Sequence, residues 1–149
     1  MLLMLKKSKL SEIFRKVLLY WAPPVVWGAL IFSGSSTTAI QVSRVYWQDF
    51  VIHKTAHIIE YAILGILIYR ALRQEKIGKI EAVVYSIVIS AFYGMTDEFH
   101  QSFTPTRTPR VRDVIIDTIG ASIGIIIVWK LLPKTHPKLM TWAEKLGLH

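Results

Sequence analysis

The sequence predicts an all-α integral membrane protein: one domain, residues 1–149, with four transmembrane helices and both termini in the cytoplasm. Hydrophobic residues make up 52% of the chain and mean hydropathy is +0.40, which are high values for a water-soluble domain. The apolar residues gather in four segments, each able to cross about 30 Å of hydrocarbon as a helix. The net charge is +8, and the basic residues flank the apolar segments as they do in membrane proteins.

The first expected span, 17–36, contains no charged residue and follows a basic tail, 1–16. Pro23 and Pro24 lie early in this span, where they predict either a kink or a late helix start. A signal peptide is the competing interpretation. We do not favour it, because no clear small-x-small cleavage site follows the apolar run and further spans come later.

The other expected spans, 54–72, 80–102 and 113–132, have short uncharged cores. They reach spanning length only if His57, Glu60, Asp97, Glu98 and Asp117 lie inside them. A soluble bundle of buried helices is the alternative, but no segment shows the wide polar stripe that a surface helix needs. Residues 133–149 are expected to form a second cytoplasmic tail, with a short helix at the membrane interface after Pro133.

The distribution of basic residues predicts the orientation in the cytoplasmic (inner) membrane. Most Lys and Arg residues lie in the two tails and in the loop between the second and third spans. The opposite side carries only Arg44, Lys54, Arg107, Arg110 and Arg112. The positive-inside rule therefore places both tails in the cytoplasm. An anionic leaflet accounts for the excess of positive charge, and no nucleic-acid partner is needed.

Three of the spans carry acids at a similar depth below the outer surface. Helical rise places Glu60 roughly 10 Å, and Asp97, Glu98 and Asp117 roughly 6 Å, into the membrane. Ionisable groups inside a bilayer are costly and commonly mark functional sites. We therefore expect an outward-facing polar site where these helices meet.

Helical spacing indicates which of these residues share a face. His53, His57 and Glu60 are spaced i, i+4 and i+7 and form one stripe, and Asp113 and Asp117 are spaced i, i+4. Gly120 and Gly124 continue close to the Asp113–Asp117 face. They form a small-x-x-x-small pattern that permits close helix packing, so this face is expected to look into the bundle.

The loop between the third and fourth spans carries arginines, and Pro105 and Pro109 stiffen it. Guanidinium groups suit phosphate or carboxylate ligands. Arg107 is the candidate anion ligand, although pairing with a nearby acid is an equal alternative. Arg110 and Arg112 are expected to be solvated loop charges.

Two elements carry a family resemblance. The second span contains Lys-x-x-His-x-x-x-Tyr-x-x-Leu, from Lys54 to Leu64. The third contains Asp-Glu-x-x-Gln-x-Phe-x-Pro-x-Arg, from Asp97 to Arg107, followed by Asp113, Asp117 and Gly120. Between about Trp21 and Leu131 the chain resembles the VanZ-like family of small bacterial membrane proteins. It departs from the family in having His53 where Asp is frequent and Thr106 where Gly is frequent.

The resemblance implies a cell-envelope membrane protein, with resistance to teicoplanin-type glycopeptides as a possible role. Some family members have carried the enzyme name phosphotransbutyrylase. We do not extend that activity to this chain, because it has no phosphate-binding Gly-rich loop.

Three functional hypotheses follow. In the first, the site recognises an anionic envelope lipid, such as a polyprenyl phosphate, or a cell-wall precursor. The proposed ligand-binding residues are Lys54, His57, Tyr61, Glu98, Gln101, Arg107, Asp113 and Asp117. In the second, the site is an intramembrane acid–base enzyme, whose proposed catalytic residues are His57, Glu60, Asp97 and Glu98. In the third, the same side chains form a structural polar network without a ligand.

No cofactor is expected. The alternative is a divalent metal, because His53 and His57 have a spacing that permits metal binding and carboxylates lie nearby. There is no HExxH motif, and without cysteine thiolate metal sites are excluded.

Overall fold

The computed structural model describes residues 10–35, 46–103, 109–135 and 137–148, and all regular structure within them is helical. The elements are η1 (Val17–Trp21), α2 (Ala22–Ser35), α3 (Tyr46–Gln74), α4 (Lys79–Gln101), α5 (Val111–Ile126), η2 (Ile127–Leu131), η3 (Leu132–Lys134) and α6 (Pro137–Lys145). Four helical stretches are long and apolar enough to cross a membrane: Leu10–Ser35, Phe50–Gln74, Lys79–Gln101 and Val111–Lys134. The prediction of an all-α bundle of four membrane-spanning helices is confirmed.

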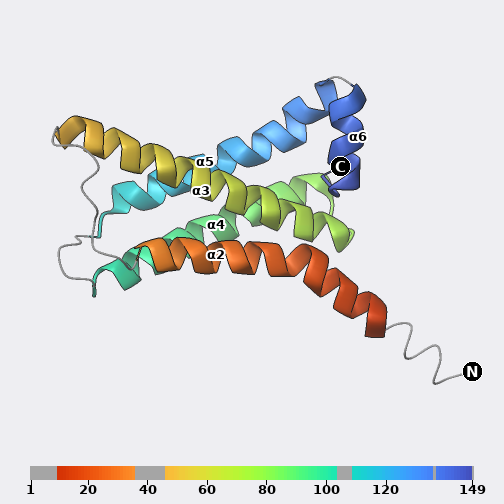
Figure 1. The fold of residues 1–149 in the computed structure, drawn as a ribbon, viewed down its shortest axis with the longest axis horizontal. Helices are drawn as coiled ribbons and strands as arrows, with labels where there is room; N and C mark the ends of the chain where they lie inside the picture. Colours follow the sequence, from red (N-terminus) through yellow and green to blue (C-terminus); the bar gives the residue numbers. More distant parts are fainter. Residues whose placement is uncertain (1–9, 36–45, 104–108, 136, 149) are drawn as a thin grey trace, which may run out of the picture.

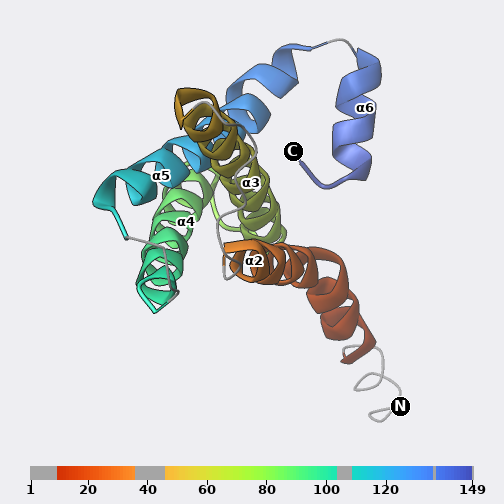
Figure 2. The same cartoon turned by 60° about the vertical axis from the view of Figure 1, so that its left-hand side comes forward.

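Helix α3 is the central element of the bundle, because it packs against α2, α4 and α5. Figures 1 and 2 show α3, α4 and α5 grouped together, with α2 along one side and the helical stretch that precedes α2 directed away from the group. Helix α3 begins at Tyr46, ahead of the expected start at Lys54. Its additional turns extend beyond the polar residues that the sequence singled out.

The two prolines of the first span lie within a continuous helical stretch, so the late-start alternative is wrong. The wide π-helical turn η1 ends at Trp21, two residues before Pro23, and the ribbon bends in this region (Figure 1). Pro23 has no N–H and would clash with the carbonyl of Leu19 in a regular helix. Arg70 Nη1 of α3 donates a hydrogen bond of 3.1 Å to that carbonyl. A side chain of the neighbouring helix α3 therefore replaces the hydrogen bond that the Leu19 carbonyl loses at Pro23.

Helices α3 and α5 approach closely at the glycines of α5. A Cβ atom added at Gly120 would lie 2.6 Å from the carbonyl oxygen of Ile58, and one at Gly124 would overlap the carbonyl oxygen of Ala62. The contact continues where Gly65 of α3 faces Ala121. The inward orientation expected for this face of α5 is confirmed by the burial of Asp117, Gly120 and Gly124.

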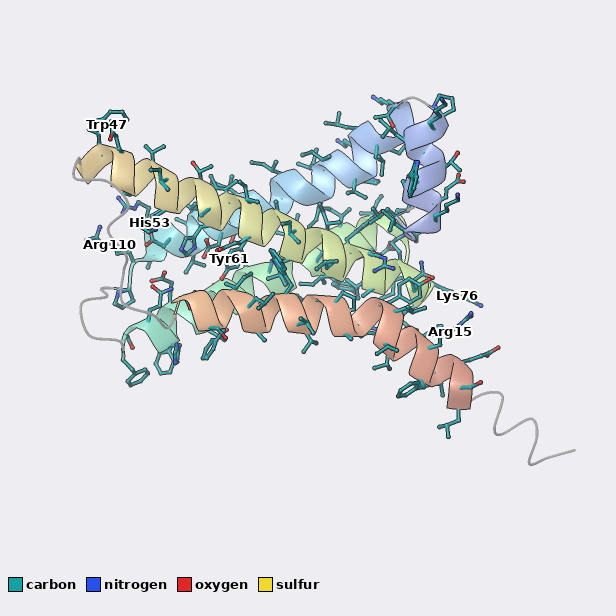
Figure 3. All side chains as sticks on the ribbon, in the orientation of Figure 1. Arg15, Trp47, His53, Tyr61, Lys76 and Arg110 are labelled. Atoms are coloured by element: carbon teal, nitrogen blue, oxygen red, sulfur yellow. The ribbon has the colours of Figure 1, made fainter. Side chains whose placement is uncertain are left out.

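The two ends of the bundle differ in composition. Figure 3 shows Trp47, His53 and Arg110 at one end, here called the site end, and Arg15 and Lys76 at the other, called the basic end. The short helix expected after Pro133 is α6, which lies near the basic end (Figure 1). Arg70 ties the chain after α6 to the bundle, since its Nε donates to the carbonyl of Leu146.

Candidate functional site

Two acids of α5 face two bases of α3. Lys54 Nζ lies 2.7 Å from Asp113 Oδ2, and His57 Nδ1 lies 3.1 Å from Asp117 Oδ1. The i, i+3 spacing on α3 and the i, i+4 spacing on α5 place both pairs along the same seam. The Asp117 side chain is only 1% exposed, and a buried charge of this kind requires a partner. Asp117 meets this need with the ring of His57.

The contact with Asp117 also determines what His57 can offer to other molecules. When Asp117 is ionised and His57 is neutral, the hydrogen of the imidazole is on Nδ1 and the Nε2 atom is left as an acceptor. The His57 side chain is 17% exposed, whereas its partner is almost fully buried. The pair therefore consists of a buried orienting acid and a more accessible ring.

Asp97 of α4 connects helices α2 and α4. Its Oδ1 atom accepts a hydrogen bond from Ser35 Oγ at 2.5 Å, and its Oδ2 atom accepts one from Gln101 Nε2 at 2.8 Å. Asp97 is 1% exposed, and both donor residues are buried. Asp97 thus has a hydrogen-bond donor on each oxygen.

Glu98 of α4 contacts the start of α5. Its Oε2 atom accepts the backbone N–H of Arg110 at 2.8 Å, and Arg110 is the N-cap residue of α5. A carboxylate at a helix N-terminus is favoured by the exposed N–H groups and by the helix dipole. This contact fixes the position of Arg110, whose side chain is exposed.

Gly94 and Tyr61 join these groups at the centre of the bundle. A Cβ atom at Gly94 of α4 would lie 3.4 Å from Asp117 Oδ2 and 3.6 Å from Tyr61 Cε1. Tyr61 is 0% exposed, and its ring stacks on His57 with the centroids 6.4 Å apart. Its hydroxyl has no hydrogen-bond partner among the described residues. The Tyr61 hydroxyl can therefore still donate a hydrogen bond within the buried cluster.

Glu60 and the loop arginines lie at the margin of this cluster. Glu60 is half-buried, and its backbone carbonyl accepts a 2.9 Å hydrogen bond from Trp27 Nε1. Its carboxylate takes part in none of the hydrogen bonds given above. Arg112 Nε lies 3.5 Å from Asp113 Oδ1, and its guanidinium is 4.9 Å from the centre of the Phe50 ring. Arg107 lies outside the described residues.

The structure brings together most of the other residues that the sequence singled out for the site, with Glu60 at the margin: Lys54, His57, Tyr61, Asp97, Glu98, Gln101, Asp113 and Asp117. It adds Ser35, Trp27 and Gly94, to which we assigned no role. Ser35 lies in a Ser-rich run at the end of the first span, a signal that could have suggested a polar contact. Nothing in the local pattern of Trp27 or Gly94 predicts the partner of either residue. Among the residues that the structure describes, no three His, Asp or Glu side chains are placed to hold a metal ion together.

The four long apolar helices and the buried acids, each bonded across helices, define a multi-pass membrane protein with an intramembrane polar cluster. The chain belongs to the VanZ/LLP1 family, whose model matches residues 5–132. The match includes every residue of the cluster, and the resemblance seen in the sequence is confirmed. No curated protein and no solved structure matches the chain.

Proposed function

We propose that this VanZ-like protein recognises an anionic, phosphate-bearing envelope lipid or cell-wall precursor at the site end. One observation carries the proposal: four acids of the cluster, Asp97, Glu98, Asp113 and Asp117, are held by partners within the protein, whereas an arginine at the rim is not. The guanidinium of Arg110 is exposed and forms no ion pair within the part of the chain that the structure describes. Arginine matches the geometry of phosphate oxygens, so Arg110 is suited to bind such a group.

The intramolecular partners of the acids explain how an anion could approach them. Asp97 accepts hydrogen bonds from Ser35 and Gln101. Asp113 pairs with Lys54, and Asp117 pairs with His57. Glu98 accepts the backbone N–H of Arg110. These contacts reduce repulsion of an incoming phosphate and hold Lys54, His57 and Arg110 in position. The sequence expectation for Arg107 remains part of the proposal.

The direct test is binding of a polyprenyl phosphate to the purified protein in nanodiscs. Losing a hydrogen bond to a charged group costs about 1.5–3 kcal/mol, so Arg110→Ala should weaken binding at least about tenfold. Arg107→Ala should act in the same direction. Lys76→Ala, at the basic end, is the matched control and should bind normally. Unchanged affinity in the double variant Arg107→Ala/Arg110→Ala would refute the proposal.

The proposal also requires the site end to face outward from the cytoplasmic membrane, as the positive-inside rule indicates. The chain contains no cysteine, so single cysteines can be introduced without removing others. Ser102→Cys at the site end should react with a membrane-impermeant maleimide on intact cells. Lys76→Cys should react only after permeabilisation. The reverse pattern would contradict the orientation.

A second candidate, an intramembrane acid–base enzyme acting on the same kind of lipid, is favoured by the His57–Asp117 pair. A buried acid that orients a histidine through Nδ1 leaves Nε2 available as a general base. Glu60 is then the candidate acid. His57→Gln should abolish turnover of the lipid while the protein still assembles and binds.

A purely structural network makes a different prediction for the same residues. If the cluster only holds the helices together, His57→Gln and Glu98→Gln should reduce expression and give aggregated protein on size-exclusion chromatography. If the cluster binds a ligand, both variants should elute like the wild type and bind less lipid. Expression and lipid binding, measured on the same preparations, separate the structural hypothesis from the ligand-binding hypothesis.

The role in the organism is a further part of the proposal. A protein that binds a cell-wall precursor at the outer surface could alter sensitivity to teicoplanin-type glycopeptides. Expression of the wild-type protein in a sensitive host should then raise the inhibitory concentration, and Arg110→Ala should not. Equal inhibitory concentrations for wild type and vector would count against this role.

A further inference from the structure

An apolar groove lies between α2, α3 and α4. It has a volume of about 300 Å³, and its walls include Trp21, Val25 and Gly28 of the first helical stretch, Leu64 and Ile68 of α3, and Tyr93 of α4. Its lining residues, within the described part of the chain, include no charged side chain. Val25 is 68% exposed, so the groove is accessible from the side of the bundle that faces lipid. Its surroundings therefore suit a hydrocarbon chain.

The groove exists because α2 packs loosely against its neighbours. The contacts that hold α2 include three single polar bonds: Ser35 to Asp97, Trp27 to the Glu60 carbonyl, and Tyr93 to the Gly28 carbonyl at 2.5 Å. Ile31 adds a buried apolar contact with the core, and Phe32 packs on the ring of His100. At the α3–α5 seam, in contrast, glycines allow the backbones to touch. Space that side chains leave between helices in a membrane is filled by lipid chains, because leaving it empty would lose van der Waals contacts.

Tyr93 connects the groove with the polar cluster. Its ring lines the groove and lies 6.3 Å, centroid to centroid, from the ring of Tyr61. Tyr61 in turn stacks on His57. Helical rise places Gly28 roughly 10 Å from Ser35 along α2, and Trp21 roughly 10 Å further. The groove thus begins where the cluster ends and runs toward the basic end.

We infer that this groove holds the hydrocarbon chain of the lipid whose phosphate binds at the site end. The inference rests on the proposed function, because it assigns the second half of the same ligand. A volume of about 300 Å³ is at the lower limit for ligand pockets, so it takes a segment of one chain. The ligand class is therefore a lipid phosphate that places one long chain in the groove, with its head at Arg110 and its tail past Tyr93.

Photo-crosslinking in phosphatidylcholine nanodiscs tests the assignment. The probe is an isoprenoid monophosphate with a diazirine in the middle of its chain, compared with the corresponding neutral alcohol. Mass spectrometry should map the crosslinks to residues 21–29 and 89–93. Val25→Trp fills the groove and should reduce labelling at least fivefold. Val26→Trp is the matched control, because Val26 is 58% exposed but does not line the groove.

The possible outcomes separate the two proposals. Crosslinks spread over all four helices, or equal labelling in Val25→Trp and Val26→Trp, would overturn the groove assignment. If the unlabelled phosphate lipid still displaced the probe and Arg110→Ala still weakened binding, the proposed function would stand without the groove assignment. If the alcohol and the phosphate labelled the groove equally and Arg110→Ala had no effect, both proposals would fail.

Discussion

The seam between α3 and α5 and the seam between α2 and the rest of the bundle are built in different ways. At the first, Gly120 and Gly124 bring the two backbones into contact, and two acid–base pairs lie beside them. At the second, single hydrogen bonds from Ser35, Trp27 and Tyr93 cross a partly open interface. The close seam fixes the geometry of the polar cluster, and the open seam leaves room for a lipid chain.

This difference assigns separate tasks to the helices. Side chains on helices that cannot separate keep fixed distances, which recognition of a small head group requires. A helix held by a few hydrogen bonds has low local contact density and opens at a lower free energy. We therefore expect substitutions at the α3–α5 seam to affect the whole fold, and substitutions at the α2 seam to act locally.

The largest effect is expected from Gly124→Leu. A Cβ atom at this position overlaps the carbonyl of Ala62, and the larger side chain would force α3 and α5 apart, so we expect loss of monodisperse protein. Gly34→Leu is the control, because a Cβ there meets no atom of the described residues within 4 Å. Size-exclusion chromatography of both variants is the measurement. A normal elution profile for Gly124→Leu would show that the seam is not as close as described.

Asp117→Ala should have the next largest effect. It removes the partner of His57, a carboxylate whose side chain is only 1% exposed. Losing a hydrogen bond to a charged group costs about 1.5–3 kcal/mol, to be measured as the free energy of unfolding in detergent. Asp117→Asn retains an oxygen that can accept from Nδ1 and should lose less. Equal losses in the two variants would mean that the contact with His57 contributes nothing.

These two positions illustrate how far sequence reasoning extends. The glycine spacing of α5 and the acids on three helices predicted the packed face and the shared depth, because helical periodicity relates residues a few positions apart. The pairing of His57 with Asp117 joins residues 60 positions apart, and that of Ser35 with Asp97 joins residues 62 apart. Which helix lies beside which depends on packing of the whole bundle, so no local pattern predicts these partners.

Tyr93→Phe tests the open seam with a smaller change. It removes the hydrogen bond to the Gly28 carbonyl while keeping the ring, so the expected loss is about 1 kcal/mol. Amide exchange should increase in α2 and remain unchanged in α5. Tyr85→Phe is the control, because Tyr85 lies on the same helix and is 50% exposed. Faster exchange in α5 as well would indicate that the two seams open together.

The smallest effect is expected at the basic end. Lys16 Nζ lies 3.3 Å from Glu75 Oε2, with side chains 45% and 39% exposed. Exposed pairs of this kind contribute about 0–1 kcal/mol, because solvent and salt screen them and two flexible side chains must be ordered. Lys16→Gln should therefore leave the free energy of unfolding almost unchanged. Lys54→Gln should cost more, since its pair with Asp113 is only 19% and 14% exposed and its loss leaves a half-buried acid. The two pairs differ in burial. An equal loss of unfolding free energy in these two variants would mean that burial does not set the strength of the ion pairs at the two ends.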